Sequence, residues 1–330
     1  MIKMRRLILI GLIGIVSASA QLFPNLGGQR VGTSAAQFLK IGVGARAIAL
    51  GESYVALAND ASALYWNPAG ISQFNQHDLF FNYNQWFADI KITYTGAVVH
   101  LNSINSIGVF FSTLSTDEMR ETTELQPMGT GRTFIYGDLL GGLTYARNMT
   151  DKFSFGVTVK YLSETLAELK MNAVLFDLGT YYKTGWKSTR FAVAVTNFAP
   201  EIGPHGSFSY KDLQNKLVRV NDFQKFTPPI IFRIGLAAEL LETARQKITG
   251  SVQLNHPNDN SENLNFGVEY WLGQLAAVRC GYITSREDRD LSIGFGLNLP
   301  MGKNRLRLDY SFANFGRLGF VSQYSMHVNL

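Results

Sequence analysis

The chain has 330 residues, which is enough for two ordinary soluble domains or one large all-β domain. Only 17% of the residues are charged, against about 25% in a typical soluble domain. Glycine is frequent at 31 residues, and the chain has 23 Phe and 14 Tyr. Few charges with many aromatic and glycine residues indicate a protein whose outer surface does not face water everywhere, and argue against an ordinary soluble domain.

Residues 1–20 have the pattern of a secretory signal peptide. Lys3, Arg5 and Arg6 form a basic region, residues 7–16 an apolar core, and residues 18–20 a small-residue cleavage site. The apolar core is too short to span a bilayer as a helix, which takes about 20 residues. Removal of the signal takes away three positive charges and leaves an excess of two. So small an excess gives no support to nucleic-acid binding.

Residues 21–77 are rich in small residues and include the stretch IGVGARAIALGESYVALANDASALYWNPAG at 41–70. Gly42-x-Gly44-x-x-Ala47 has the outline of a dinucleotide-binding turn, but that turn requires further βαβ units, and none follows. The alternative is a plug inside a barrel, in which small residues permit close backbone packing. Asp60 is expected to cap a short helix that runs through Trp66 and ends at Asn67-Pro68.

From residue 78 onward, apolar and polar residues alternate with a period of two, as in FSFGVTVKYL and LSIGFGLNL. This alternation is typical of amphipathic strands. Many of the strands reach ten residues, the length that a tilted membrane strand needs. We expect fourteen strands, at 78–86, 91–101, 104–114, 133–148, 152–164, 171–184, 188–198, 227–240, 245–255, 262–272, 275–284, 289–299, 303–312 and 320–330.

The connections between these strands alternate in length. One set is short, whereas the other includes the long stretches 115–132 and 199–226. Short turns and both termini at one end, with longer loops at the other, are typical of an outer-membrane barrel. The sequence therefore predicts an all-β protein, a fourteen-stranded antiparallel transmembrane β-barrel over 78–330, with residues 21–77 as a plug of short helices in its lumen. The alternative, a secreted soluble sandwich, requires neither the regular strand lengths nor the asymmetry.

Eight charged residues fall on the strand face opposite the large apolar residues. Because an Arg or Lys facing lipid near the midplane costs about 2–4 kcal/mol, these side chains should point into the lumen. Four are positive and four negative, which favours ion pairing across the lumen over an open ion-selective pore. They are Lys160, Asp177, Arg233, Glu239, Glu269, Arg279, Arg307 and Asp309.

No motif in the chain indicates catalysis or a cofactor. The five histidines are scattered without metal-ligand spacing, and no G-x-S-x-G motif is present. The single cysteine, Cys280, alternates onto the apolar face, where a buried thiol is expected to be inert. We therefore expect no enzymatic activity, metal or cofactor.

Two segments resemble the PorV/PorQ family, within the FadL-like outer-membrane barrels. They are GTSAAQFLKIGVGARAIALGESYVALANDASALYWNPAG at 32–70 and LDYSFANFGRLGFVSQYSM near the C-terminus. The resemblance implies a fourteen-stranded barrel with an N-terminal hatch inside it. The residues that correspond to the hatch motif and its preceding turn are Gly42, Gly44, Ala45, Arg46, Asp60, Trp66, Asn67, Pro68, Ala69 and Gly70.

The resemblance implies two alternative functions in the bacterial outer membrane. PorV-type members act in type IX secretion, where they associate with the translocon and carry or shuttle cargo, and loops 115–132 and 199–226 would then contact partners. FadL-type members pass hydrophobic small molecules across the outer membrane. We expect the first function, with outer-membrane lipid as the surroundings of the barrel and with no nucleic-acid partner.

Overall fold

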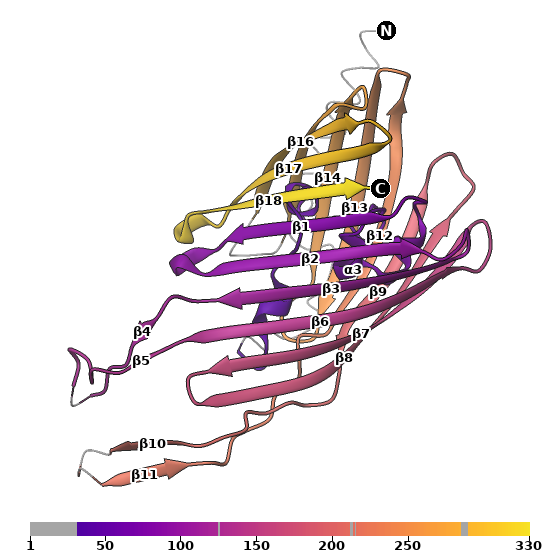
Figure 1. The fold of residues 1–330 in the computed structure, drawn as a ribbon. Coiled ribbons are helices and arrows are strands. Elements are labelled where there is room, and N and C mark those ends of the chain that lie inside the picture. The colour runs from indigo at the N-terminus through magenta and orange to yellow at the C-terminus, as the bar shows by residue number, and fades with distance from the viewer. Residues whose placement is uncertain (1–31, 125, 212–213, 215, 285–289) are drawn as a thin grey trace.

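The structure is a computed structural model that describes residues 32–124, 126–211, 214, 216–284 and 290–330. Fourteen antiparallel strands form a closed barrel, as expected from the alternation (Figure 1). The predicted signal peptide lies outside the described residues. The strands of the wall are β1 (Asp78–Gln85), β2 (Lys91–His100), β3 (Asn105–Ser115), β6 (Tyr136–Asn148), β7 (Phe153–Leu166), β8 (Leu169–Lys183), β9 (Arg190–Phe198), β12 (Ile231–Glu242), β13 (Gln246–Pro257), β14 (Asn263–Leu272), β15 (Ala276–Ile283), β16 (Leu291–Met301), β17 (Asn304–Asn314) and β18 (Phe320–Asn329).

The barrel closes where the first strand meets the last. β1 pairs with β18 along its whole length, with Asp78 opposite Asn329 and Gln85 opposite Ser322. Every other strand pairs with its neighbour in the chain, except where the two long connections intervene. Closure leaves the wall without an unpaired edge. A sheet can span a bilayer only when it is closed in this way, because unpaired backbone groups would face lipid.

Side chains sort onto the two faces of the wall as the period of two requires. Along β7 and β8, buried lumen positions alternate strictly with exposed outer ones over most of their length. Large apolar residues such as Phe155, Leu178 and Phe295 lie on the outer face. Cys280 is also exposed there, so lipid rather than protein covers its thiol, contrary to the expected buried position. None of the described helices is long and apolar enough to cross a membrane.

The expected strand limits agree with the structure to within two residues, except at two strands. The strand expected at 133–148 begins at Tyr136, and the strand expected at 227–240 begins at Ile231. The second difference has a clear cause, because Pro228 and Pro229 cannot donate ladder hydrogen bonds.

Both long connections contain hairpins that the alternation did not predict. β4 (Met119–Arg120) pairs with β5 (Thr133–Phe134), and β10 (Phe208–Lys211) pairs with β11 (Leu217–Val220). They extend beyond the wall at one end of the barrel, called here the long-loop end (Figure 1). The other end, the short-turn end, carries the chain's C-terminus and the tight connections, such as residues 149–152 and 243–245.

The lumen is filled by residues that precede β1. This plug contains η1 (Gln37–Lys40), α2 (Ala45–Ala49), α3 (Ala63–Trp66) and η2 (Pro68–Ser72). All of the residues of α2, α3 and η2 are buried. Two further short 3-10 helices, η3 (Phe87–Asp89) and η4 (Gly316–Leu318), lie in loops of the long-loop end.

Candidate functional site

The plug touches the wall at positions where the wall has glycine. A Cβ on Gly281 would lie 1.9 Å from the backbone N of Gly51, and one on Gly179 would lie 2.1 Å from Oδ1 of Asn67. No side chain fits at either place, because real Cβ atoms do not approach other heavy atoms below 3.0 Å. Wall glycines 156 and 267 also meet the plug backbone, and wall glycines 235 and 294 meet plug side chains, those of Val55 and Ala49. The plug backbone therefore rests directly on the wall.

Hydrogen bonds hold α2, the first α-helix of the plug, in place. Gly44, with a φ of 97°, precedes α2, and the amide of Ala45 donates to Oγ of Ser325 over 2.6 Å. Gln323, also on β18, donates to the carbonyl of Gly42 over 2.9 Å. Gly42 itself packs within the plug, against Ile48 and Trp66. These contacts fix the direction in which the next residue, Arg46, projects.

The second half of the plug is fixed by the motif around Trp66. Nε1 of Trp66 donates to the carbonyl of Val43 over 2.7 Å. Asn67 begins η2 by accepting the amide of Ala69, and its Nδ2 donates to the carbonyl of Thr180 on the wall. Pro68, Ala69 and Gly70 are buried in this 3-10 turn. The helix ends at Trp66, as expected.

Asp60 was expected to be the N-cap residue of α3, but it lies two residues before the actual N-cap. The N-cap position of α3 is Ser62, and Asp60 accepts both the amide and the hydroxyl of Ser62. Its other oxygen accepts from Tyr54 and contacts two arginines. Asp60 therefore shapes the turn into α3 and also joins a larger ionic cluster.

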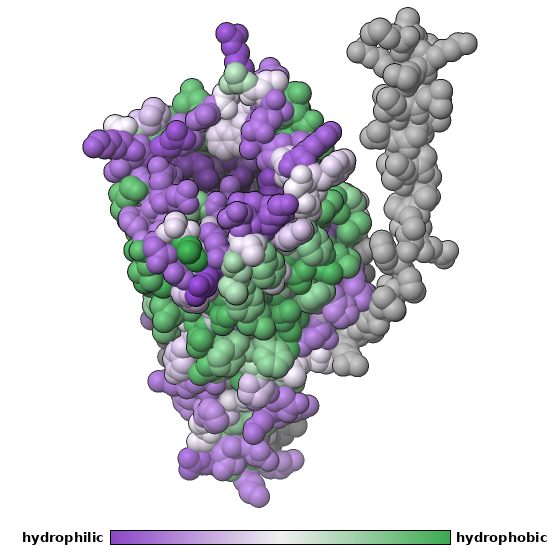
Figure 2. Space-filling model, turned by 90° about the vertical axis from the view of Figure 1, so that its right-hand side faces the viewer, coloured by the Kyte–Doolittle hydropathy of each residue, from purple (hydrophilic) through white to green (hydrophobic). Residues whose placement is uncertain are grey.

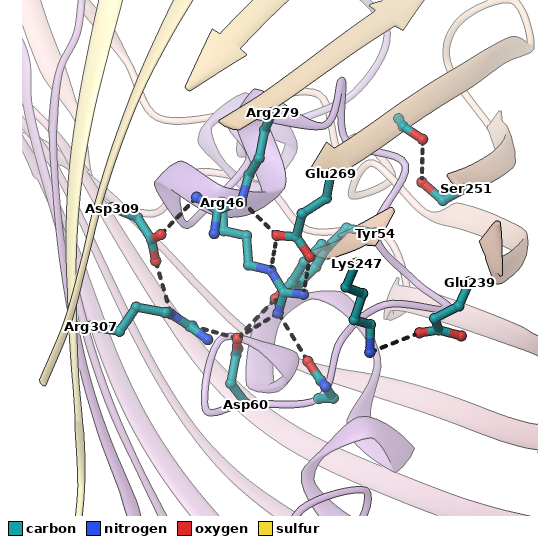
Figure 3. A network of polar contacts seen from close by, with 12 residues as sticks. Arg46, Tyr54, Asp60, Glu239, Lys247, Ser251, Glu269, Arg279, Arg307 and Asp309 are labelled. Atoms are coloured by element: carbon teal, nitrogen blue, oxygen red, sulfur yellow. Dashed lines mark hydrogen bonds and ion pairs between the residues drawn. The ribbon is translucent and has the colours of Figure 1, made fainter. Parts of the chain in front are cut away.

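Six charged side chains form a closed ring of alternating sign, called here the charge ring (Figure 3). Arg46 binds Glu269 through two contacts of 2.8 Å, and Arg279 joins Glu269 to Asp309 at 2.6 and 2.7 Å. Arg307 joins Asp309, at 3.0 Å, to Asp60, at 2.6 Å. A contact of 3.3 Å between Asp60 and Arg46 completes the ring.

The charge ring links two parts of the chain that are distant in sequence. Arg46 and Asp60 come from the plug, whereas Glu269, Arg279 and the β17 pair Arg307 and Asp309 come from the wall. All six side chains are at most 15% exposed. The ring carries no net charge, and removing a single partner from such a buried set typically costs about 3–5 kcal/mol.

Burial and neighbouring charges shift the pKa values of plug groups in opposite directions. Burial favours the neutral form of Asp60, but His327, Arg307 and Arg46 outweigh it and hold the pKa of this carboxyl well below its ordinary value. Burial raises the pKa of Tyr54 well above its usual range. Asp60 is therefore an anion and Tyr54 a neutral donor at neutral pH.

The other lumen charges expected from the sequence lie outside the ring. Nζ of Lys160 contacts Asp177 at 2.6 Å, and Arg233 donates to Oγ1 of Thr196 and lies 5.3 Å from the centre of the Trp66 ring. Glu239 binds Arg190 at 2.8 Å and Lys247 at 3.3 Å. Arg190 and Lys247 were not among the expected lumen charges, although the alternation along β9 and β13 places both on the lumen face.

Two separate cavities flank the plug. A polar one of about 1260 Å³ opens at the short-turn end and includes Arg46, Asp60, Glu269 and Arg307 in its lining. A smaller one of about 330 Å³ lies between the plug, which contributes Ile48, and loop residues of the long-loop end, among them Trp86 and Phe315. No described residue lines both cavities.

Fold and site together define the class of protein: a closed fourteen-stranded barrel of the outer-membrane type, with its N-terminal segment inside the lumen. The Ralstonia pickettii toluene transporter TbuX is similar at a TM-score of 0.59 and 13% identity, over 87% of this chain and 97% of that chain. The monoaromatic hydrocarbon channel CymD is similar at a TM-score of 0.59 and 13% identity, over 88% of this chain and 97% of that chain. A Pseudomonas aeruginosa FadL homologue is similar at a TM-score of 0.55 and 13% identity, over 84% of this chain and 95% of that chain. At this identity the likeness shows the fold alone.

The family model for the type IX secretion system protein PorV matches residues 25–255, more than half of the chain. The chain therefore belongs to the PorV family, as the resemblance at residues 32–70 implied. No curated protein sequence matches it at a significant level. The protein is an outer-membrane β-barrel of type IX secretion, and its family and fold are those of secretion and transport barrels. Its short-turn end, with the C-terminus, faces the periplasm.

Proposed function

We propose that this barrel is a closed binding platform, which contacts the translocon and secreted cargo proteins of type IX secretion through its outer hairpins. The observation that carries the proposal is the fixed plug. Its backbone rests on wall glycines, and the charge ring ties it to three strands. A plug held in this way supports a static body that binds partners rather than a conduit, and we assign the barrel no chemical reaction.

The hairpins of the long-loop end offer the contact surface. Phe208 stacks on Tyr210 and Phe223, with ring centres 6.1 and 6.2 Å apart, yet Tyr210 remains 46% exposed. Leu217 on β11 and Met128 between β4 and β5 are exposed as well. Aromatic residues and methionine are enriched at protein interfaces. Exposed apolar side chains on a hairpin beyond the wall are thus suited to contact another protein.

Site-specific photo-crosslinking tests this proposal. A photoreactive phenylalanine analogue at Tyr210 should crosslink to a translocon component or to a secreted protein. The same analogue at Trp186, which is more exposed than Tyr210 but lies in a turn of the short-turn end, is the control. Removal of β10 and β11 should stop secretion while the barrel remains in the outer membrane. Normal secretion without either hairpin would refute the proposal.

The smaller cavity favours a second candidate function, binding of hydrophobic small molecules. Its lining includes Ile41, Ile90 and Leu114 beside Trp86 and Phe315, and about 330 Å³ is at the lower end of the range for small-molecule sites. A Trp86→Ala variant should then lose binding of an apolar fluorescent probe that the wild-type barrel binds, whereas Trp186→Ala should not. Equal binding by both variants would exclude this cavity as the site.

A further inference from the structure

The larger cavity opens to the periplasm as a polar vestibule with an excess of positive charge. Eight basic and five acidic side chains line its volume of about 1260 Å³. Figure 2 looks at this end of the barrel, where hydrophilic side chains surround a hollow and a hydrophobic belt lies beside it. The charge ring and the plug form the floor, so the vestibule is a dead end rather than the mouth of a channel.

The acidic side chains of the vestibule are almost all engaged already. Asp60 and Glu269 belong to the charge ring, while Glu239 pairs with Arg190 and Lys247, and Lys247 also contacts Glu242. Of the five acids, Asp151 is the one for which no ion pair is found within the described part of the chain.

Four basic side chains of the vestibule, in contrast, lack an acidic partner among the described residues. They are Lys152, Lys183, Lys187 and Arg305. Lys183 and Arg305 occupy lumen-facing positions of β8 and β17, and Lys152 and Lys187 lie in the neighbouring short turns. These four cations line the cavity, so their position is not explained by contact with lipid headgroups outside the wall.

The placement of these cations indicates the shape of the ligand. β8 and β17 are seven strands apart in the closed order of fourteen, so Lys183 and Arg305 stand on opposite sides of the vestibule. A single compact anion cannot contact both sides at once, whereas a chain that bears several carboxylates can. The same cavity is lined by amide side chains that can hydrogen-bond to a peptide backbone, namely those of Gln73, Asn75, Gln76, Gln274, Asn298 and Asn329.

We propose that the periplasmic vestibule is a docking site for an acidic polypeptide segment of a periplasmic partner. The carboxylates of the segment bind Lys152, Lys183, Lys187 and Arg305, and the cavity amides contact its backbone. This site is on the face opposite the outer hairpins and does not depend on their role. Charge complementarity of this kind accelerates association and selects against basic partners.

Binding of defined peptides to the full-length barrel in zwitterionic detergent tests the site. Fluorescein-labelled decaglutamate should bind, as measured by fluorescence anisotropy, and labelled decalysine should not. Raising the salt from about 0.05 M to about 0.5 M should weaken binding, since screening shortens the reach of the charges. A decaglutamate with one photoreactive residue should crosslink to vestibule residues such as Trp271.

Substitution of the four cations by glutamine should weaken decaglutamate binding about tenfold or more. None of the four has an acidic partner among the described residues, so the variant should keep the heat-modifiable migration of a folded barrel. The matched control removes four basic residues at the long-loop end, through Arg120→Gln, Arg219→Gln, Lys225→Gln and Arg317→Gln, and should bind as the wild type does. Equal binding by the two variants, crosslinks that map to the hairpins, or full competition by inorganic phosphate would overturn the proposal.

Discussion

Replacement of Gly281 by alanine should dislodge the plug from the wall. The new methyl group would lie 1.9 Å from the N of Gly51 and 2.1 Å from the carbonyl carbon of Leu50. An ordinary contact needs at least 3.4 Å, so the plug backbone must move by about 1.5 Å. Both of those atoms are backbone, and no change of rotamer can relieve the clash.

The displacement reaches the charge ring through two backbone hydrogen bonds. Gly51 donates to the carbonyl of Ile48, and Glu52 donates to that of Ala47, so α2 moves with the turn. Overpacking alone costs about 1–3 kcal/mol. Separation of Arg46 from Glu269 adds a term of about 3–5 kcal/mol, the typical cost of breaking a buried pair. Either term is a large fraction of the roughly 5–15 kcal/mol that stabilises a typical protein.

Limited trypsin digestion measures this effect directly. Arg46 is buried in the wild-type protein, so cleavage after Arg46 shows that the plug has moved away from the wall. The temperature at which the barrel loses its heat-modifiable migration should also fall. Gly141→Ala is the matched control, because its methyl group would lie 3.9 Å from Phe111, an ordinary contact. If Gly281→Ala resisted trypsin at Arg46 as the wild type does and kept the same transition temperature, the plug backbone would not rest on the wall at Gly281.

Three further predictions concern the plug. Arg46→Ala should destabilise the barrel by about 3–5 kcal/mol, because it leaves Glu269 without this partner. The double variant Arg46→Met with Glu269→Met should recover part of this loss, as measured by denaturant unfolding. Equal effects of the single and double variants would contradict this. The pKa of Asp60 is lower in the folded protein than the ordinary value of about 3.9. Its stabilisation is therefore complete above that value and is lost as the pH falls towards the folded pKa. The thermal transition should decline in acid, and Asp60→Asn should flatten that decline; an unchanged profile in the variant would count against the assignment. Trp66→Ala should cost about 3–5 kcal/mol, as truncation of a buried aromatic does, and expose Arg46 to trypsin; wild-type protection would show that Trp66 does not hold the plug.

The sequence was sufficient to predict the wall because each strand is a local pattern. In LSIGFGLNL, alternation alone assigns Ile293 to lipid and Gly294 to the lumen. The outer hairpins were not predicted, since β4 has two residues and β10 has four, too few for a period of two to be recognised. Their strands form through pairing with each other rather than through a local pattern.

The charge ring was predictable only in part. Alternation places Glu269, Arg279 and Arg307 inside the lumen, but their partners depend on how the plug folds. Arg46 lies 223 residues before Glu269, and no local pattern joins them. The need for small residues in the plug was also predictable. Gly51 makes close contacts with the backbone of wall strand β15, whereas Gly42 makes its close contacts within the plug.

The seat of the plug also constrains the order in which the barrel can be built. The plug precedes β1, yet its partners in the charge ring, Glu269 and Arg307, lie on β14 and β17, near the other end of the chain. Ala61 of the plug donates to Asp78 at the start of β1, and Asp78 in turn contacts His327 on β18. A plug whose backbone fits into gaps in the wall cannot be threaded into a finished cylinder. The last strands must therefore fold around it, and the plug serves as the template on which the cylinder is sealed.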